Sequence, residues 1–272
     1  MSFITRSASS KRPHEKNSIK VGMYYTDDDD DREIYYVNDR SRGKRELTLP
    51  SKIDFTPFLK LSSNQRSASY ISSPSGSGKS VLSAHLINEL RQIRGPLISE
   101  EGIEERKVVI FSLGNSKNDD AYNSVKNVNL VHVDLNNPDF LNIEPDMLEN
   151  CVAVFDDFTS AGTSLKKAII LLVNQLLELS RKQKTDVLVI SHVIRAGIQS
   201  KTMIFESDSV YLNPASNINA VKKFLSSYAD MEKKDIDELQ NLFDKSDDEF
   251  AWLLLHKSHP RYIIYNNVIK MI

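Results

Sequence analysis

The stretch that most constrains the fold of this chain is the segment SPSGSGKS at 73–80, which ends in Gly78-Lys79-Ser80. A short strand-like run at 67–72 precedes it, and apolar residues at helical spacing follow it. In such a strand–loop–helix unit, consecutive backbone N–H groups point inward, the helix adds its positive end, and the lysine reaches the outer groups of a bound anion. The segment therefore predicts a loop that holds phosphate groups.

One position departs from the usual pattern of this loop, G-x-x-x-x-G-K-[ST]. Ser73 stands where the pattern has glycine, and a small residue is acceptable there if its φ is negative. Gly76 and Gly78 supply the flexible positions, Lys79 the charge, and Ser80 a hydroxyl for Mg²⁺. A serine-rich turn is the alternative interpretation, but it does not explain the strand before the loop and the helix after it. The residues that we expect to bind nucleotide are Ser73, Pro74, Ser75, Gly76, Ser77, Gly78, Lys79, Ser80, Val81 and His192.

The rest of the chain from about Lys52 alternates between strand-like and helix-like segments. Continuous apolar runs typical of buried strands occur at 107–113, 128–133, 151–157 and 186–192, with amphipathic helices after the loop and after the third of these runs. Apolar strands that alternate with helices indicate a mainly parallel sheet covered on both faces. We therefore predict an α/β fold, that of a P-loop NTPase (RecA/ASCE-like) with a mainly parallel central sheet flanked by helices.

Residues 1–50 differ in composition from the remainder. They include polar and basic stretches and a block of five acids, Asp27–Asp31, and such segments bury too little apolar surface to offset their ordering entropy. We expect a flexible polar N-terminal arm over 1–50 and a P-loop ATPase domain over 51–272. The apolar run 34–37 would add either an edge strand or a contact with a neighbour. The acidic block is expected to be solvated.

The overall composition excludes several classes of protein. The 35 Lys+Arg residues against 37 Asp+Glu give a net charge of −2, so any DNA contact should be local, such as a pore lining. The single cysteine, Cys151, excludes an internal disulfide and fits a reducing compartment. No run approaches the ~20 apolar residues that span a bilayer, and the first residues have no apolar signal region. We expect an intracellular protein without a membrane-spanning segment.

A pair of carboxylates, Asp156 and Asp157, ends the third apolar run, 77 positions after the lysine. A carboxylate at the carboxyl end of a strand beside the loop can hold the Mg²⁺ shell together with Ser80. The next carboxylate can orient an attacking water and accept its proton. The alternative is a pair of solvated acids that cap the following helix.

Three further residues carry weaker signals. His192 ends the fourth apolar run, where many P-loop ATPases place a polar residue that senses the γ-phosphate; a local hydrogen-bonding role is the alternative. Arg181 ends the long helix and Arg195 follows the sensor strand, so either is a candidate for an arginine that reaches a neighbouring subunit's γ-phosphate. Solvated residues or partners of the helix dipole are the ordinary interpretation of both.

Several of these motifs together resemble a known family. SPSGSGKS, VAVFDD, LLELSRKQKTDVLVISH and the later KTMIFESDSVYLNPAS and VKKFLSSY are similar to the poxvirus-type genome-packaging ATPases of large eukaryotic DNA viruses, in the FtsK/HerA group of P-loop motors. The resemblance covers roughly residues 67–228. Two positions depart from the family pattern: Ser73 replaces the first glycine, and His192 stands where the sensor strand usually ends in glutamine.

The resemblance implies hydrolysis of ATP, with Mg²⁺, to drive double-stranded DNA into a capsid through a homo-oligomeric ring. Lys79, Asp157 and Arg181 would be the catalytic residues, and Ser80 and Asp156 the metal ligands. The implied partners are double-stranded DNA and capsid or portal-vertex proteins. The implied locations are the host cytoplasm, in the viral factory, and the virion.

Two other classes of protein are compatible with a phosphate-binding loop. A nucleoside or nucleotide kinase carries such a loop, but it usually has an arginine-rich lid, which we do not find in the sequence. A virion structural protein could bind nucleotide without hydrolysing it. The presence of Lys79, Ser80, Asp156 and Asp157 argues against that class, since a nucleotide site that has lost its hydrolytic activity often lacks one of these groups.

Overall fold

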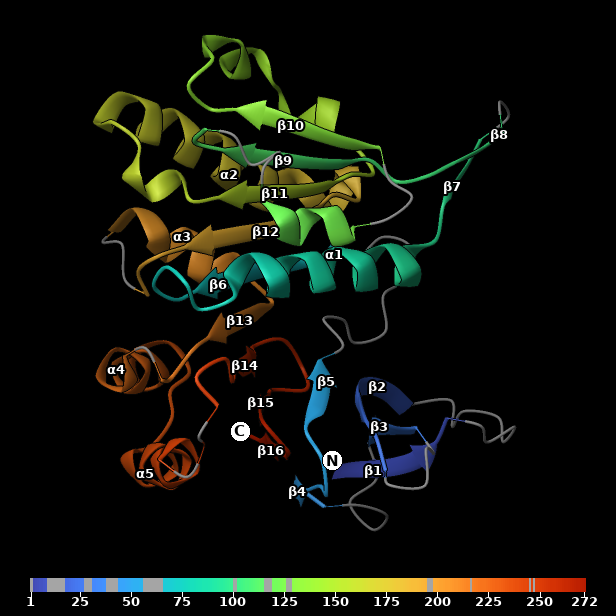
Figure 1. Cartoon of the computed structure of the whole chain (residues 1–272), viewed down its shortest axis with the longest axis vertical. Helices are drawn as coiled ribbons and strands as arrows, with labels where there is room; N and C mark the ends of the chain where they lie inside the picture. The colour runs from blue at the N-terminus through green and yellow to red at the C-terminus, as the bar shows by residue number, and fades with distance from the viewer. Residues whose placement is uncertain are drawn as a thin grey trace. The chain divides into compact units, whose positions relative to one another are not determined.

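The structure is a computed structural model of the whole chain (Figure 1). It describes residues 2–8, 18–26, 31–37, 44–55, 66–99, 102–114, 119–125, 129–194, 198–215, 217–244, 246 and 248–272. The chain divides into two compact units, one formed by residues 61–210 and the other by residues 1–60 together with 211–272.

Unit 61–210 contains five parallel strands in the order β10-β9-β11-β12-β6 (Figure 1). Their bounds are β6 Ala68–Ser72, β9 Val108–Ser112, β10 Leu130–Asp134, β11 Val152–Asp156 and β12 Asp186–Ser191. The spatial order differs from the chain order, because β12 lies between β6 and β11. All five carboxyl ends meet at one edge of the sheet, and that edge carries the loop after β6 and the two carboxylates after β11.

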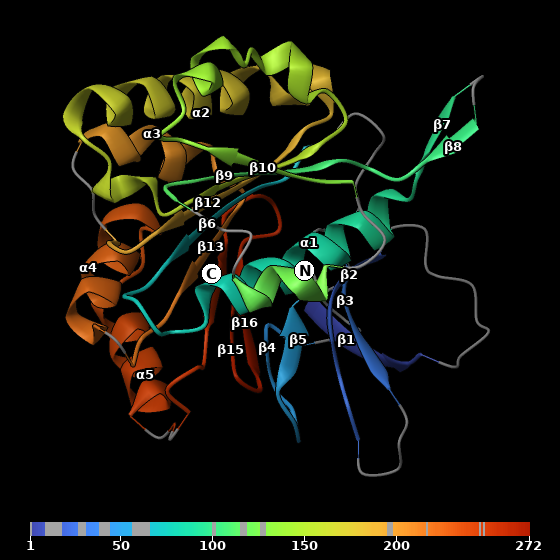
Figure 2. The ribbon, with the colours of Figure 1, turned by 45° about the horizontal axis from the view of Figure 1, so that its top comes forward.

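Helices cover both faces of this sheet. Figure 2 shows α1 (Lys79–Arg94) on one face and α2 (Thr163–Gln183) with α3 (Ile198–Glu206) on the other. The predicted stripe of α1 packs inward through Leu82, Leu86 and Leu90, which are buried, whereas Ile93 near the helix end is 40% exposed. Burial on both faces explains why β9 and β12 are apolar along nearly their whole length.

Shorter elements complete this unit. They are the hairpin of β7 (Leu97–Ser99) and β8 (Gly102–Glu104), and the 3₁₀ helices η2 (Asp120–Ser124), η3 (Pro138–Asn142), η4 (Pro145–Leu148) and η5 (Phe158–Ser160). β13 (Ser209–Leu212) contains the boundary between the two units.

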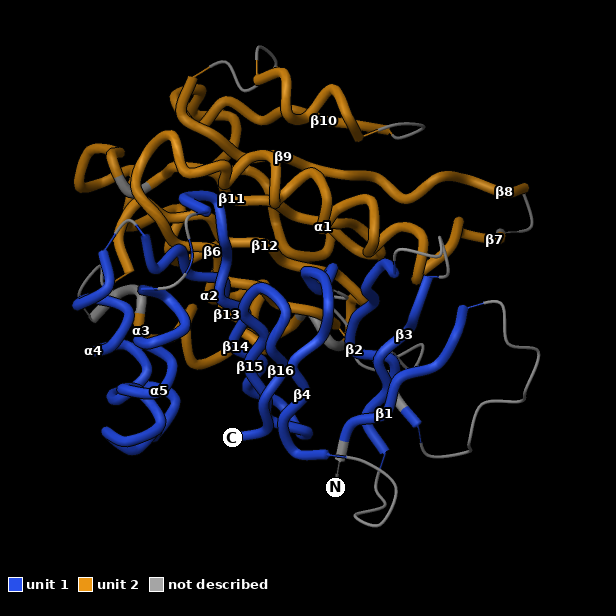
Figure 3. Tube along the Cα trace, turned by 60° about the horizontal axis from the view of Figure 1, so that its bottom comes forward, with its two compact units in different colours: residues 1–60, 211–272 blue, residues 61–210 orange. Residues whose placement is uncertain are grey.

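The other unit combines both ends of the chain (Figure 3). A four-stranded antiparallel sheet has the order β1-β3-β2-β5, with β1 Ser2–Ser7, β2 Ser18–Tyr24, β3 Arg32–Val37 and β5 Ile53–Phe55. Antiparallel strands β14 (Leu253–His256), β15 (Tyr262–Tyr265), β16 (Val268–Met271) and β4 (Glu46–Thr48) follow one another in that order. Helices α4 (Ile218–Tyr228) and α5 (Lys233–Phe243) belong to the same unit.

This arrangement differs from the predicted flexible arm over 1–50 and from a single domain over 51–272. Phe3, Val21 and Ile34 are buried, and the Phe3 ring packs edge-on against Tyr262 with ring centroids 6.1 Å apart. The run 34–37 lies in β3, in the middle of the four-stranded sheet rather than at its edge. Local composition does not reveal these strands, because apolar strand residues alternate with charged turns and the average over the segment is therefore polar. Of the acidic block, residues 27–30 lie outside the described residues.

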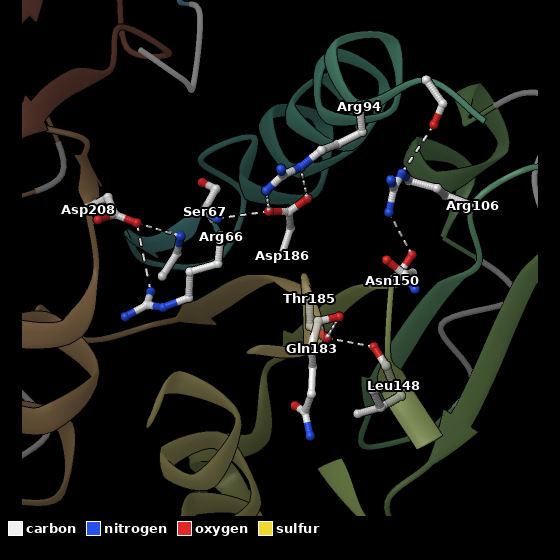
Figure 4. Close-up of polar contacts among 12 residues, drawn as sticks. Arg66, Ser67, Arg94, Arg106, Leu148, Asn150, Gln183, Thr185, Asp186 and Asp208 are labelled. Carbon is white, nitrogen blue, oxygen red and sulfur yellow. Dashed lines mark hydrogen bonds and ion pairs between the residues drawn. The ribbon is translucent and has the colours of Figure 1, made fainter. Parts of the chain in front are cut away.

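An ion-pair network ties α1 to the amino end of the parallel sheet (Figure 4). Arg94, in the last turn of α1, binds both carboxylate oxygens of Asp186 at the start of β12, at 2.6 and 3.0 Å. The Ser67 backbone N–H, just before β6, donates to the same carboxylate at 2.8 Å. Arg106 donates to the Gly95 carbonyl, where α1 ends. The network fixes the far end of the helix whose first residues form the phosphate loop.

Candidate functional site

The loop after β6 has the backbone geometry that its sequence predicts. Gly76 and Gly78 have φ values of 80° and 81°, a region that side chains disfavour and glycine adopts without strain. Ser73 has no such φ, and its backbone N–H donates to the Ser191 carbonyl at 3.2 Å, continuing the pairing of β6 with β12. Serine therefore fits the position where the usual pattern has glycine.

Helix α1 presents an open amino end to this loop. Gly78 is its N-cap, no side chain caps the helix, and the first turn contains no acidic residue. Its leading backbone N–H groups and the positive end of its dipole are therefore directed at the loop without a competing carboxylate.

Lys79 is buried in the loop, with only 8% of its surface exposed. Its Nζ donates to the Pro74 carbonyl at 2.6 Å and lies 3.2 Å from His192 Nδ1. Burial lowers the pKa of Lys79, whereas the charges of Asp157 and Asp156 act to raise it. A bound phosphate would give this ammonium group the anionic partner that the loop itself does not provide.

Asp156 ends β11, and its carboxylate accepts a hydrogen bond from a tyrosine that the sequence motifs did not identify. The Tyr122 hydroxyl donates to Asp156 Oδ2 at 2.9 Å. Burial raises the pKa of Asp156, and the hydrogen bond from Tyr122 lowers it by favouring the ionised form. Burial and the nearby Asp156 raise the pKa of the Tyr122 hydroxyl, so Tyr122 remains a neutral donor.

Asp157 is joined to Lys79 through a histidine. His192 Nε2 lies 2.6 Å from Asp157 Oδ1, while Nδ1 of the same ring faces Lys79 Nζ. A lysine ammonium can only donate, so Nδ1 accepts, and the opposite side of the ring lies against the Asp157 carboxylate as an ion-pair contact rather than an aligned hydrogen bond. Asp157 itself has a φ of 53°, which turns the chain sharply as it leaves β11.

The turn after β12 holds His192 in this position. Tyr70, on β6, and Ser191 both donate a hydroxyl hydrogen bond to the Val193 carbonyl, at 3.2 and 3.0 Å. Both contacts fix the residue that follows His192, and so restrict the turn that carries the imidazole.

The structure brings most of the predicted site residues together at one edge of the sheet. The loop, Asp156, Asp157 and His192 all lie there, whereas the Val81 side chain is 66% exposed. Arg181 belongs to α2, but its side chain lies outside the described residues, as does the whole of Arg195.

Sequence reasoning missed Tyr122 and Ser112. Tyr122 lies in a turn-rich segment without a recognisable motif. Ser112 ends β9, as the register partner of Asp156, and was detectable because the carboxyl ends of parallel strands meet at one edge. Its buried hydroxyl has no hydrogen-bond partner among the described residues.

These side chains fit a magnesium ion that is bound together with a nucleotide. Mg²⁺ prefers oxygen ligands and usually combines one or two carboxylates with substrate phosphates. Asp156 and Ser80 offer a carboxylate and a hydroxyl, and the unpartnered Ser112 hydroxyl adds a polar group in register with Asp156. The described part of the chain has no group of three or more His, Cys, Asp or Glu residues able to hold a metal, so phosphate oxygens would have to complete the shell.

The strand order, the loop and the strand-end carboxylates define a P-loop NTPase fold of the ASCE type, in which one strand lies between the loop strand and the carboxylate strand. The structure of the pCW3 conjugation coupling protein TcpA, solved with ATPγS, is similar to this chain, with a TM-score of 0.51 and 10% identity. The similarity covers 91% of this chain and 77% of TcpA. The predicted fold class is thereby confirmed.

Two further proteins of viral origin are similar to the chain. The uncharacterized protein V3 of Sputnik virophage is 26% identical over 240 residues, which cover 86% of this chain and 88% of the relative. The genome packaging NTPase B204 of Sulfolobus turreted icosahedral virus 2 has a TM-score of 0.46 and 11% identity, over 76% of this chain and 96% of B204. No family model matches the chain. Within its described ranges, no helix combines the length and apolar character required to cross a membrane.

Proposed function

We propose that this chain is an ATP-hydrolysing motor that moves double-stranded viral DNA into a capsid. The observation that carries the proposal is the connection from Lys79 through His192 to Asp157, beside Asp156. A simple phosphate-binding turn needs only the loop and the lysine. A hydrolase also needs a carboxylate held where it can act on water, and Asp157 would supply it.

The residues divide the work of hydrolysis between them. The loop N–H groups and Lys79 bind the phosphates, and Lys79 would exchange the Pro74 carbonyl for a phosphate oxygen. Asp157 orients the attacking water and accepts its proton, while the His192 ring lies against that carboxylate at 2.6 Å and restricts its position. Ser80 and Asp156 would hold Mg²⁺, which supplies positive charge against the phosphate oxygens.

The use of this hydrolysis to move DNA rests on the motif resemblance to packaging ATPases. Two comparisons support this use of hydrolysis: the relative from a virophage, and the fold shared with a conjugation coupling protein. The net charge of −2 fits a homo-oligomeric ring that touches DNA only through its pore. The partners of such a motor would be capsid or portal-vertex proteins. It would act in the host cytoplasm and be found in the virion.

The test is the ATP hydrolysis rate of the purified full chain, with and without double-stranded DNA. We expect a basal rate that rises with DNA and is abolished in Lys79→Ala, since the lysine contacts the phosphates and its loss leaves the strands and helices in place. Phosphate transfer to an added nucleoside, without a response to DNA, would identify a kinase. Tight nucleotide binding without turnover would identify a structural protein.

A further inference from the structure

Tyr122 connects the helix after the phosphate loop to the carboxylate of β11. It lies in η2, in the connection between β9 and β10, and only 2% of its surface is exposed. Its hydroxyl donates to Asp156 Oδ2 at 2.9 Å and also interacts with Ser83 on α1. A second contact, from Asn88 on α1 to the Ser124 carbonyl at 3.3 Å, holds η2 against the same helix.

The two ends of the sheet hold their carboxylates in different ways. At the amino end, Asp186 is bound on both oxygens by the Arg94 guanidinium, which balances its charge, and the Ser67 backbone N–H donates to it as well. At the carboxyl end, a neutral hydroxyl holds Asp156 by one oxygen. A neutral donor fixes the direction of a carboxylate without neutralising it, so the negative charge stays available to a cation.

We infer that Tyr122 is a positioning residue for Mg²⁺: it fixes one oxygen of Asp156 so that the other faces the shell of the nucleotide-bound ion. The inference rests on the proposed function, because it assigns the metal to that same site. Groups that orient a metal ligand without touching the metal typically contribute roughly 10- to 100-fold to metal affinity. Tyr122 would act in this way, and the packing of its ring would be a separate contribution to the fold.

The inference is tested by binding a fluorescent ATP analogue to the full chain while Mg²⁺ is titrated, with no hydrolysis required. Tyr122→Phe keeps the ring and removes the hydroxyl. We expect this variant to need about ten-fold more Mg²⁺ for half-maximal enhancement of binding. Its nucleotide affinity in EDTA should equal that of the wild type. The increase in melting temperature on adding Mg²⁺ to the nucleotide-bound protein should shrink in parallel.

Tyr211→Phe is the matched control, since Tyr211 is also fully buried but lies in the other unit. An unchanged Mg²⁺ requirement in Tyr122→Phe would overturn the inference and leave the proposed function standing. Loss of nucleotide binding in EDTA, or an equal effect in the control, would reduce Tyr122 to a packing residue. A wild-type chain that binds no nucleotide would instead refute the proposed function, and this inference with it.

Discussion

His192 Nε2 lies 2.6 Å from Asp157 Oδ1, and the other nitrogen of the ring lies 3.2 Å from Lys79 Nζ. The three residues belong to the ends of β12 and β11 and the start of α1, which come together because β12 lies between β6 and β11. One imidazole thus joins Lys79, which we propose binds phosphate, to Asp157, which we propose acts on water.

The first prediction concerns this histidine. His192→Ala should bind nucleotide normally but turn over about 100-fold more slowly, because Asp157 loses the group that orients it. His192→Gln should retain most of the rate, since an amide can donate to Asp157 and accept from Lys79. Turnover and analogue binding measured on both variants check this, and a wild-type rate in His192→Ala would show that the bridge has no role in turnover.

The second prediction separates the two carboxylates. Asp156→Ala should weaken binding of Mg-nucleotide, because a metal ligand is lost. Asp157→Asn should bind Mg-nucleotide normally and hydrolyse it slowly, because an amide cannot accept the proton from water. Titration of a fluorescent ATP analogue, followed by single-turnover hydrolysis, distinguishes them. Equal loss of binding in both variants would mean that the assigned roles are wrong.

The third prediction concerns assembly and follows from the position of Arg181 near the end of α2. Arg181→Ala should keep its nucleotide affinity and lose roughly 1,000-fold or more in turnover, the usual effect of removing an arginine finger. In rings mixed with wild-type subunits, activity should fall by more than the inactive fraction. A strictly proportional loss would exclude Arg181 and make Arg195 the next residue to test.

The fourth prediction concerns the amino end of the sheet. Asp186→Ala leaves the Arg94 guanidinium buried without its carboxylate, which should lower the free energy of unfolding by about 3–5 kcal/mol. Glu105→Ala removes the partner of Arg91 at a site where the glutamate side chain is 54% exposed, and should cost less than ~1 kcal/mol. Denaturant unfolding of both variants gives the comparison. Similar losses of unfolding free energy in the two variants would show that the buried Arg94–Asp186 pair stabilises the fold no more than the partly exposed Arg91–Glu105 pair does.

The fifth prediction concerns pH. Burial lowers the pKa of His256 from 6.5 to about 3, so the folded chain keeps this ring neutral while the unfolded chain takes up a proton below pH 6.5. Its contribution to stability is therefore complete above pH 6.5 and is lost as the pH falls towards 3, by up to ~1.4 kcal/mol per pH unit. Unfolding of the wild type and His256→Gln between pH 7 and 5 measures it, with exposed His85→Gln as the control. Parallel pH profiles for all three proteins would contradict the assignment.

The loop, the helix after it and the two carboxylates were predictable because their signals are local. Each of these patterns is contained in a short segment: a lysine after glycine, an apolar stripe, and a strand that ends in acids. Tyr122 was missed because it lies in a turn-rich segment and only its contact with Asp156 marks it. Ser112 was missed because its position depends on which strand pairs with β9. The sheet of β1, β2 and β3 is not evident from composition for a different reason: its buried residues are interleaved with charged ones, so the segment is polar on average.

The sequence by itself determined the α/β class, the phosphate loop and which residues carry charge near it, because backbone geometry and hydrophobic periodicity act over short stretches. Only the tertiary structure decided that His192 bridges Lys79 and Asp157, that Tyr122 holds Asp156, and that the first 60 residues form a unit with the last 62. Those relationships depend on the order in which strands pair. The strand order is the one that buries the apolar faces of all the strands and helices together. No single segment of the sequence encodes that order.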